Sequence, residues 1–97
     1  MERIGLERYH EFLRRGALVI VVQDETRPFS GLFPGAVGLS WSRIRRGEYD
    51  LPRGRPLLVL CDEGRLSMIA ALYFEADGYG PAYALEGGRR ALEGTVL

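Results

Sequence analysis

The sequence predicts an α/β fold, a small doubly wound parallel β-sheet flanked by helices on both faces. Continuous apolar runs rich in branched side chains, at 17–22 and 57–60, are typical of strands that are covered on both faces. Segments with helical periodicity, at 6–15 and 66–76, alternate with these runs. Such alternation favours a parallel sheet. Because 97 residues are room for one domain, we expect residues 1–97 to form a single domain.

The first half of the chain opens with the helix predicted at 6–15. Leu6, Tyr9 and Leu13 share one stripe of this helix, and Gly16 follows as its end. The next predicted elements are a buried strand (17–22), a polar loop (23–34), a short strand (36–39), a modest helix (42–49) and a turn-rich connector (50–56).

The second half contains the sharper pattern, a buried strand at 57–60 that ends at Cys61 and leads through a polar turn into a helix at 66–76. The apolar residues that share one face of this helix are Leu66, Ile69, Ala70 and Tyr73. We expect Tyr73 and Phe74 in the core. The remaining predicted elements are a short strand (82–85), a tight turn (86–88) and the start of a final helix (89–93).

Composition excludes several classes of function. Thirteen Lys and Arg balance thirteen Asp and Glu, so the chain lacks the basic field that binds nucleic acid or an anionic membrane surface. With one cysteine (Cys61) and one histidine (His10), we expect no metal, no cofactor and no internal disulfide. No apolar run approaches the about 18 residues of a membrane span, and the N-terminus has no signal-peptide pattern. We therefore expect a cytoplasmic protein.

Cys61 lies where open parallel sheets bind ligands, beyond the carboxyl end of a strand. The chain must turn there into the helix that begins near Leu66 or Ser67. The N–H groups of such a turn, together with the helix N-terminus, attract an anion and stabilise a thiolate. This predicts a nucleophilic cysteine with no general base beside it. A lone cysteine after an apolar strand is also typical of a buried small hydrophobe, and the strand–turn–helix pattern alone leaves both interpretations open.

The composition of the turn favours the reactive interpretation. Gly64 permits backbone conformations that are closed to other residues, and Arg65 adds positive charge. Asp62 and Glu63 act against the thiolate because they place negative charge beside it.

These residues resemble the active-site strand, loop and helix of single-domain rhodaneses. The segments that carry this resemblance are 57–67, 70–72 and 78–79. In addition, Gly-Leu-Phe-Pro-Gly-Ala at 31–36 resembles the family's Gly-His-Ile-Pro-Gly-Ala segment, and Leu-Glu-Gly-Gly at 85–88 resembles its turn near the C-terminus. The resemblance extends over essentially the whole chain and implies the rhodanese-like fold.

The resemblance also implies a reaction, sulfur transfer through a persulfide on Cys61. The donor would be a small anion such as thiosulfate or another persulfide, and the acceptor would be cyanide or a thiol, which can belong to a protein. Nucleic acid and membranes would take no part. The backbone amides that would hold the persulfide and the donor are those of Asp62, Glu63, Gly64, Arg65, Leu66 and Ser67.

The sequence departs from the family pattern at several positions. Val21-Val22-Gln23 stand where the family has Asp-Val-Arg, and Leu32 replaces its histidine. The acidic pair after the cysteine disfavours a dianionic donor, so the identity of the donor stays open.

The sequence bears on three other functions. Cysteine-dependent phosphatases need an arginine six positions after the cysteine, and that position is Ser67. A thioredoxin-like role needs a second cysteine. A non-catalytic rhodanese-like module that binds a partner or senses redox state remains the alternative.

Trp41 can pack in the core or line a pocket at the carboxyl edge of the sheet.

Overall fold

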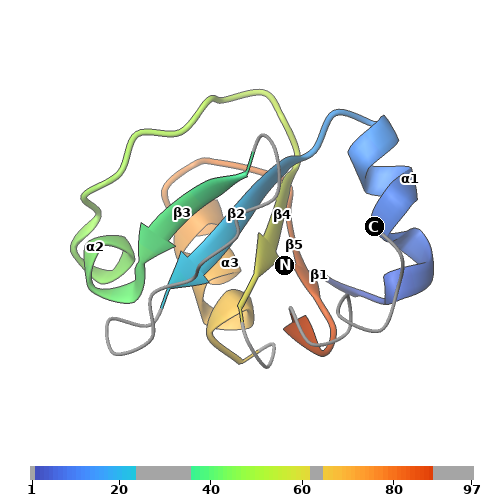
Figure 1. The fold of residues 1–97 in the computed structure, drawn as a ribbon. Helices are drawn as coiled ribbons and strands as arrows, with labels where there is room; N and C mark the ends of the chain where they lie inside the picture. Colours follow the sequence, from blue (N-terminus) through green and yellow to red (C-terminus); the bar gives the residue numbers. More distant parts are fainter. Residues whose placement is uncertain (1, 24–35, 62–64, 89–97) are drawn as a thin grey trace.

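The computed structural model of this chain describes residues 2–23, 36–61 and 65–88. Within these residues the chain forms a five-stranded sheet in the order β1-β5-β4-β2-β3, and every neighbouring pair of strands is parallel (Figure 1). The strands are β1 (Glu2–Ile4), β2 (Leu18–Gln23), β3 (Val37–Ser40), β4 (Leu57–Leu60) and β5 (Ala82–Leu85). The parallel α/β sheet predicted from the sequence is confirmed.

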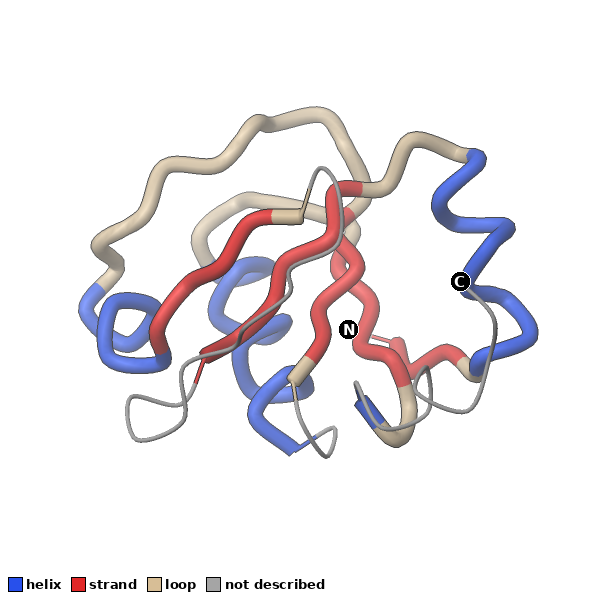
Figure 2. The backbone as a smooth tube through the Cα atoms, in the orientation of Figure 1, coloured by secondary structure: helices blue, strands red, loops and turns tan. Residues whose placement is uncertain are grey.

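Helices cover both faces of this sheet. The short 3-10 helix η1 (Leu6–Arg8) and α1 (Tyr9–Arg14) lie on one face, and α2 (Trp41–Arg46) and α3 (Arg65–Ala76) lie on the other (Figure 2). In the described ranges, no helix has both the length and the apolar character that crossing a membrane requires.

Two apolar cores fill the space between the sheet and these helices. In β2, Ile20 and Val22 pack with side chains of α2 and α3, whereas Val19 and Val21 pack with side chains of α1. The residues of β4 alternate in the same way, and all of them are 0% exposed. Because both faces of β2 and β4 are covered, their sequences are continuously apolar.

The predicted strands are confirmed as β2 to β5, and the helices differ mainly at their ends. The helix predicted at 42–49 is α2, which begins after Ser40, whose Oγ accepts a hydrogen bond from the N–H of Arg43 at 3.4 Å. It ends at Gly47, where a φ of 69° requires the freedom of glycine. Beyond Gln23, the predicted loop at 23–34 lies outside the described residues, as does the predicted final helix at 89–93.

Strand β1 was not predicted. Its residues, Glu2 to Ile4, contain one buried side chain and two exposed charged ones, so no apolar run marks them. The strand exists because it pairs with β5 along the sheet edge, with Arg3 opposite Ala84. Such pairing depends on a distant segment and leaves no local pattern.

The predicted burial of the helices was partly wrong. On α1, Tyr9 and Phe12 are buried, but Leu13 is 37% exposed. On α3, Phe74 is buried as predicted, whereas Tyr73, expected in the core, is 41% exposed. The face of α3 that packs on the sheet consists of Ser67, Ala70, Ala71 and Phe74. Because apolar residues occur on almost every side of α3, their spacing could not identify the buried face.

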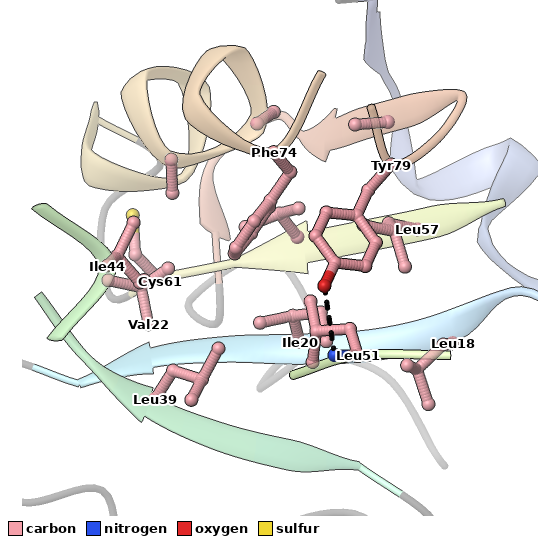
Figure 3. Close-up of a cluster of buried hydrophobic side chains, with 14 residues drawn as sticks. Leu18, Ile20, Val22, Leu39, Ile44, Leu51, Leu57, Cys61, Phe74 and Tyr79 are labelled. Carbon is pink, nitrogen blue, oxygen red and sulfur yellow. Dashed lines mark hydrogen bonds between the residues drawn. The ribbon is translucent and has the colours of Figure 1, made fainter. Parts of the chain in front are cut away.

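The connector from α2 to β4 is tied to the far end of α3. Tyr49 donates a hydrogen bond from its hydroxyl to Asp77 Oδ2 at 2.8 Å. The N–H of Leu51 donates to the hydroxyl of Tyr79 at 3.4 Å, as Figure 3 shows. The guanidinium of Arg53 lies 4.1 Å from the centre of the Tyr79 ring. These contacts hold the connector between α2 and β4, a long loop in Figure 2, against the layer that contains α2 and α3.

Adjacent residues of α3 should therefore respond very differently to substitution. Phe74→Ala is expected to lower the free energy of unfolding by about 3–5 kcal/mol, because it empties a fully buried site. Tyr73→Ala is expected to lower it by about 1 kcal/mol, because that side chain is 41% exposed and its loss removes the edge-to-face contact with Trp41. Urea unfolding of both variants measures the difference, and equal losses would contradict the burial described for α3.

The Tyr49 hydroxyl predicts how stability falls at alkaline pH. Burial, together with the hydrogen bond to Asp77, raises the pKa of Tyr49 above its usual value of 10.0. The folded state therefore holds this proton more tightly than the unfolded state, so the contribution to stability is complete below pH 10 and is lost as the pH rises further. Tyr49→Phe should cost about 0.5–1 kcal/mol at neutral pH and should make the alkaline decline shallower.

A matched variant separates the charge of Asp77 from its hydrogen bond. Asp77→Asn keeps an oxygen that accepts from Tyr49 but removes the negative charge that contributes to the raised pKa. Its alkaline decline should lie between those of the unsubstituted chain and Tyr49→Phe, as measured by thermal unfolding from pH 8 to pH 11. An alkaline decline in Tyr49→Phe as steep as in the unsubstituted chain would refute the role of this hydroxyl.

Candidate functional site

Cys61 is the first residue after β4 and lies at the carboxyl end of the sheet's central strand. Its side chain points to the face that α2 and α3 cover, and Figure 3 shows its sulfur at the edge of the cluster of buried side chains. The residue is 3% exposed. The predicted location, beyond the end of a buried strand, is confirmed, and the sulfur is close to the core.

The first turn of α3 is directed at this sulfur. The backbone N–H of Ser67, the third residue of α3, donates a hydrogen bond to Cys61 Sγ at 3.3 Å. Ser67 itself is 0% exposed, so the donor is shielded from water. An N–H group in the first turn of a helix carries part of the positive end of the helix dipole, and it therefore favours a negative charge on the sulfur.

The predicted set of loop amides is only partly within the described residues. Among its members, Arg65 begins α3 with an exposed side chain, Leu66 is half-buried against the core, and Ser67 reaches the sulfur. Asp62, Glu63 and Gly64 lie outside the described residues. The helix begins one residue earlier than expected, which brings the amide of its third residue to Cys61.

The ends of the neighbouring strands surround this position. β2 ends at Gln23, β3 at Ser40, and β5 at Leu85. After β5, the N–H of Glu86 donates to the carbonyl of Ile4 at 2.8 Å, so this turn joins the two strands at that side of the sheet. The exposed Glu86 thus has a stabilising role through its backbone.

Trp41 is the first residue of α2, next to the carboxyl end of β3, and its side chain contacts α3. It packs against the core that contains Cys61, and its ring meets that of Tyr73 edge to face, with 5.8 Å between the ring centres. Core packing was one of the two roles predicted for Trp41. The partnership with Tyr73 was not predicted, since the two residues are far apart in the sequence.

The paired arginines of α2, Arg45 and Arg46, read from the sequence as a solvated charged face, are exposed as expected. Arg43, Arg45 and Arg46 are exposed within one short helix, and a surface hollow of about 280 Å³ is lined by Ser42, Arg45 and Arg46. Arg46 binds Glu48, with 3.0 Å between Nε and Oε1, and this hydrogen-bonded partner holds the pKa of Glu48 below its usual value. The positive charge of α2 appears in the sequence as an ordinary charge cluster, which is why composition did not single it out.

The arrangement bears on the phosphatase alternative and on metal binding. Ser67 occupies the position where a cysteine-dependent phosphatase needs an arginine, and it contacts the sulfur through its backbone N–H. Within the described ranges, no group of three His, Cys, Asp or Glu side chains is placed to hold a metal ion. What the geometry offers is a buried thiol with the N–H of Ser67 directed at its sulfur.

The burial of Cys61 predicts size-selective modification of its thiol. Because the residue is 3% exposed, iodoacetamide should alkylate the native protein at least about tenfold faster than a bulky maleimide conjugate, after correction for the reactivity of each reagent with free cysteine. Unfolding in urea should abolish this selectivity. The measurement is intact mass against time, with Cys61→Ser as the unlabelled control, and equal corrected rates in the native state would show that the thiol is open to solvent.

Comparison of the amino-acid sequence finds curated relatives that match nearly the whole length of the chain. No model of a known protein family matches it. A thiosulfate sulfurtransferase GlpE from Pseudomonas syringae is 29% identical over 87 residues, which are 90% of this chain and 82% of that protein. A second GlpE, from Pseudoalteromonas translucida, is 27% identical over 93 residues, covering 95% of this chain and 89% of that protein.

Solved structures resemble the fold as well. The crystal structure of a rhodanese homologue from the extremely thermophilic bacterium Thermus thermophilus has a TM-score of 0.80 and 42% identity, and the match covers 94% of this chain and all of that one. A rhodanese-like domain protein from Staphylococcus aureus has a TM-score of 0.74 and 22% identity, covering 94% and 90% of the two chains.

Proposed function

The chain belongs to the rhodanese family, and we propose that it moves a sulfane sulfur from a donor to a nucleophilic acceptor through a persulfide on Cys61. The observation that carries this proposal is the hydrogen bond from the N–H of Ser67 to Cys61 Sγ at the start of α3. A hydrogen-bond donor in this position stabilises a thiolate and then the persulfide anion. A cysteine that stays a neutral thiol and only packs in the core would gain little from the same donor.

The reaction is two displacements at sulfur. In the first, the Cys61 thiolate attacks the outer sulfur of thiosulfate, the bond between the two sulfurs of thiosulfate breaks, and sulfite leaves with the electron pair. Cys61 is left as a persulfide anion. In the second, cyanide or a thiolate attacks the terminal sulfur, and thiocyanate or a new persulfide leaves while the Cys61 thiolate returns. Charge and atoms balance at both steps without an external oxidant or reductant.

The residues after Cys61 contribute to this proposal in two ways. The backbone amides from Asp62 to Ser67 are proposed to hold the terminal sulfur and the anionic group of the donor. The side chains of Asp62 and Glu63 bring negative charge to the same segment, and this charge opposes a dianion more than a monoanion. We therefore propose that a donor whose reacting end carries a single negative charge, such as the persulfide group of glutathione persulfide, is used more readily than thiosulfate.

The alternative is a binding or redox-sensing module that does not transfer sulfur. Cys61 is almost completely buried, as expected of a residue that only fills space. The buried amide directed at its sulfur favours the enzyme, because it matches the charge that the reaction develops.

Intact mass spectrometry tests the proposed function. Incubation with thiosulfate, 3-mercaptopyruvate or glutathione persulfide should add one sulfur atom to the native protein, fastest with glutathione persulfide, and cyanide should remove it as thiocyanate. Cys61→Ala should gain no sulfur. If a folded sample with a free thiol gains no sulfur from any of these donors, the enzyme proposal fails and the binding module is favoured.

A further inference from the structure

The outer face of α3 is apolar although it faces solvent. Ile69 is 45% exposed, Leu72 is 53% exposed and Tyr73 is 41% exposed, and all three lie within two turns of one helix. The opposite face of α3 already packs on the sheet through small residues and Phe74. A surface helix normally carries polar residues on its outer side, so this apolar face is suited to contact with another molecule.

This apolar surface extends to the sulfur site. Leu66 lies one turn before Ile69 and directly before Ser67, whose N–H contacts Cys61 Sγ. On the side of α2, Trp41 meets Tyr73 edge to face and continues the apolar surface. A molecule that covered this face would have its edge at the entrance to the proposed reaction site.

Cationic side chains border the same surface. Arg65 is exposed at the start of α3, one turn before Ile69. On α2, Arg45 is exposed one turn after Trp41 and makes no ion pair with the acidic groups of residues 2–23, 36–61 and 65–88. A partner that buries the apolar residues would gain most by placing carboxylates opposite these guanidinium groups.

We propose that these residues form a docking surface for a protein that accepts sulfur, a protein with an exposed thiol beside an apolar patch that acidic residues border. This docking surface comprises Leu66, Ile69, Leu72, Tyr73 and Trp41, with Arg45 and Arg65 at its border. The inference rests on the proposed function for the identity of the cargo, since the partner's thiol is what takes sulfur from Cys61.

The character of the surface favours an acidic partner over a second copy of this chain. A second copy would bring the same arginines with it. Of the acidic groups near the end of α3, Asp77 is already engaged by Tyr49. Docking would also speed the transfer itself. Cys61 is 3% exposed, so the thiol of a protein reaches its sulfur more efficiently when docking holds that thiol in place.

The test compares two synthetic peptides as acceptors of sulfur from the persulfide-loaded protein. One peptide carries Leu and Phe at helical spacing, Glu along one flank and a single terminal Cys, and the other has Lys in place of Glu. The second-order rate constant of transfer is measured for each, with glutathione and cyanide as small acceptors. We expect the acidic peptide to react at least about tenfold faster than the basic peptide, and the advantage to fall with added salt.

Two sets of substitutions locate the effect on the protein. Ile69→Ser with Leu72→Ser, and separately Arg45→Glu, should lower the rate constant for the acidic peptide about tenfold and leave that for cyanide unchanged. Leu13→Ser and Arg14→Glu are the matched controls, because both residues are exposed on α1 at the opposite face of the sheet. These controls should not change any rate.

Binding of the labelled acidic peptide to Cys61→Ala, followed by fluorescence anisotropy, separates docking from sulfur transfer. If the protein accepts sulfur but neither the apolar nor the arginine substitutions weaken binding of the acidic peptide, the docking proposal alone is refuted. If no donor loads Cys61, the proposed function fails while the binding measurement still tests the surface. A dimer in sedimentation experiments that Ile69→Ser with Leu72→Ser dissociates would assign the surface to a second copy and overturn the proposal.

Discussion

The complete burial of β4 is the constraint on which the rest of the structure depends. Its residues Leu57 to Leu60 are 0% exposed, and they divide between the two cores on opposite faces of the sheet. A strand held on both faces and hydrogen-bonded on both edges cannot shift in register without exposing apolar side chains. Cys61, the next residue, is therefore held at a fixed place at the carboxyl end of the sheet, which is a condition for chemistry that depends on the distance between its sulfur and the N–H of Ser67.

Helix α3 uses each of its parts for a different purpose. Its first turn presents the N–H of Ser67 to the sulfur, its inner face brings Ala70 and Ala71 close to the sheet, and its far end receives the connector through Asp77. Small residues on the inner face permit the helix to lie close to β4, and this close approach lets an amide of the first turn reach Cys61. Packing and electrostatics are thus coupled through the position of a single helix.

The parts that sequence reasoning predicted were those that local patterns determine. The runs of β2 and β4 are apolar because both faces are buried, and the position of Cys61 follows directly from the end of such a run. Strand β1 and the contact between Trp41 and Tyr73 were missed, because each depends on a partner far along the chain. The contact of Ser67 with the sulfur was predicted only as one member of a set of amides, since the exact start of α3 depends on how the helix docks.

The wrong prediction for α3 and the exposed apolar surface have one cause. Periodicity identifies a buried face only where the outer face is polar, and on α3 the outer face carries Ile69, Leu72 and Tyr73. A helix of this composition has two faces that favour burial, and the fold of one chain can cover only one of them. The side chains of Ala70, Ala71 and Phe74 fit the sheet, so the larger aliphatic residues are left outward beside the arginines of α2. Local rules tend to fail where a residue is selected for something other than folding, and here that failure marks the surface that leads to Cys61.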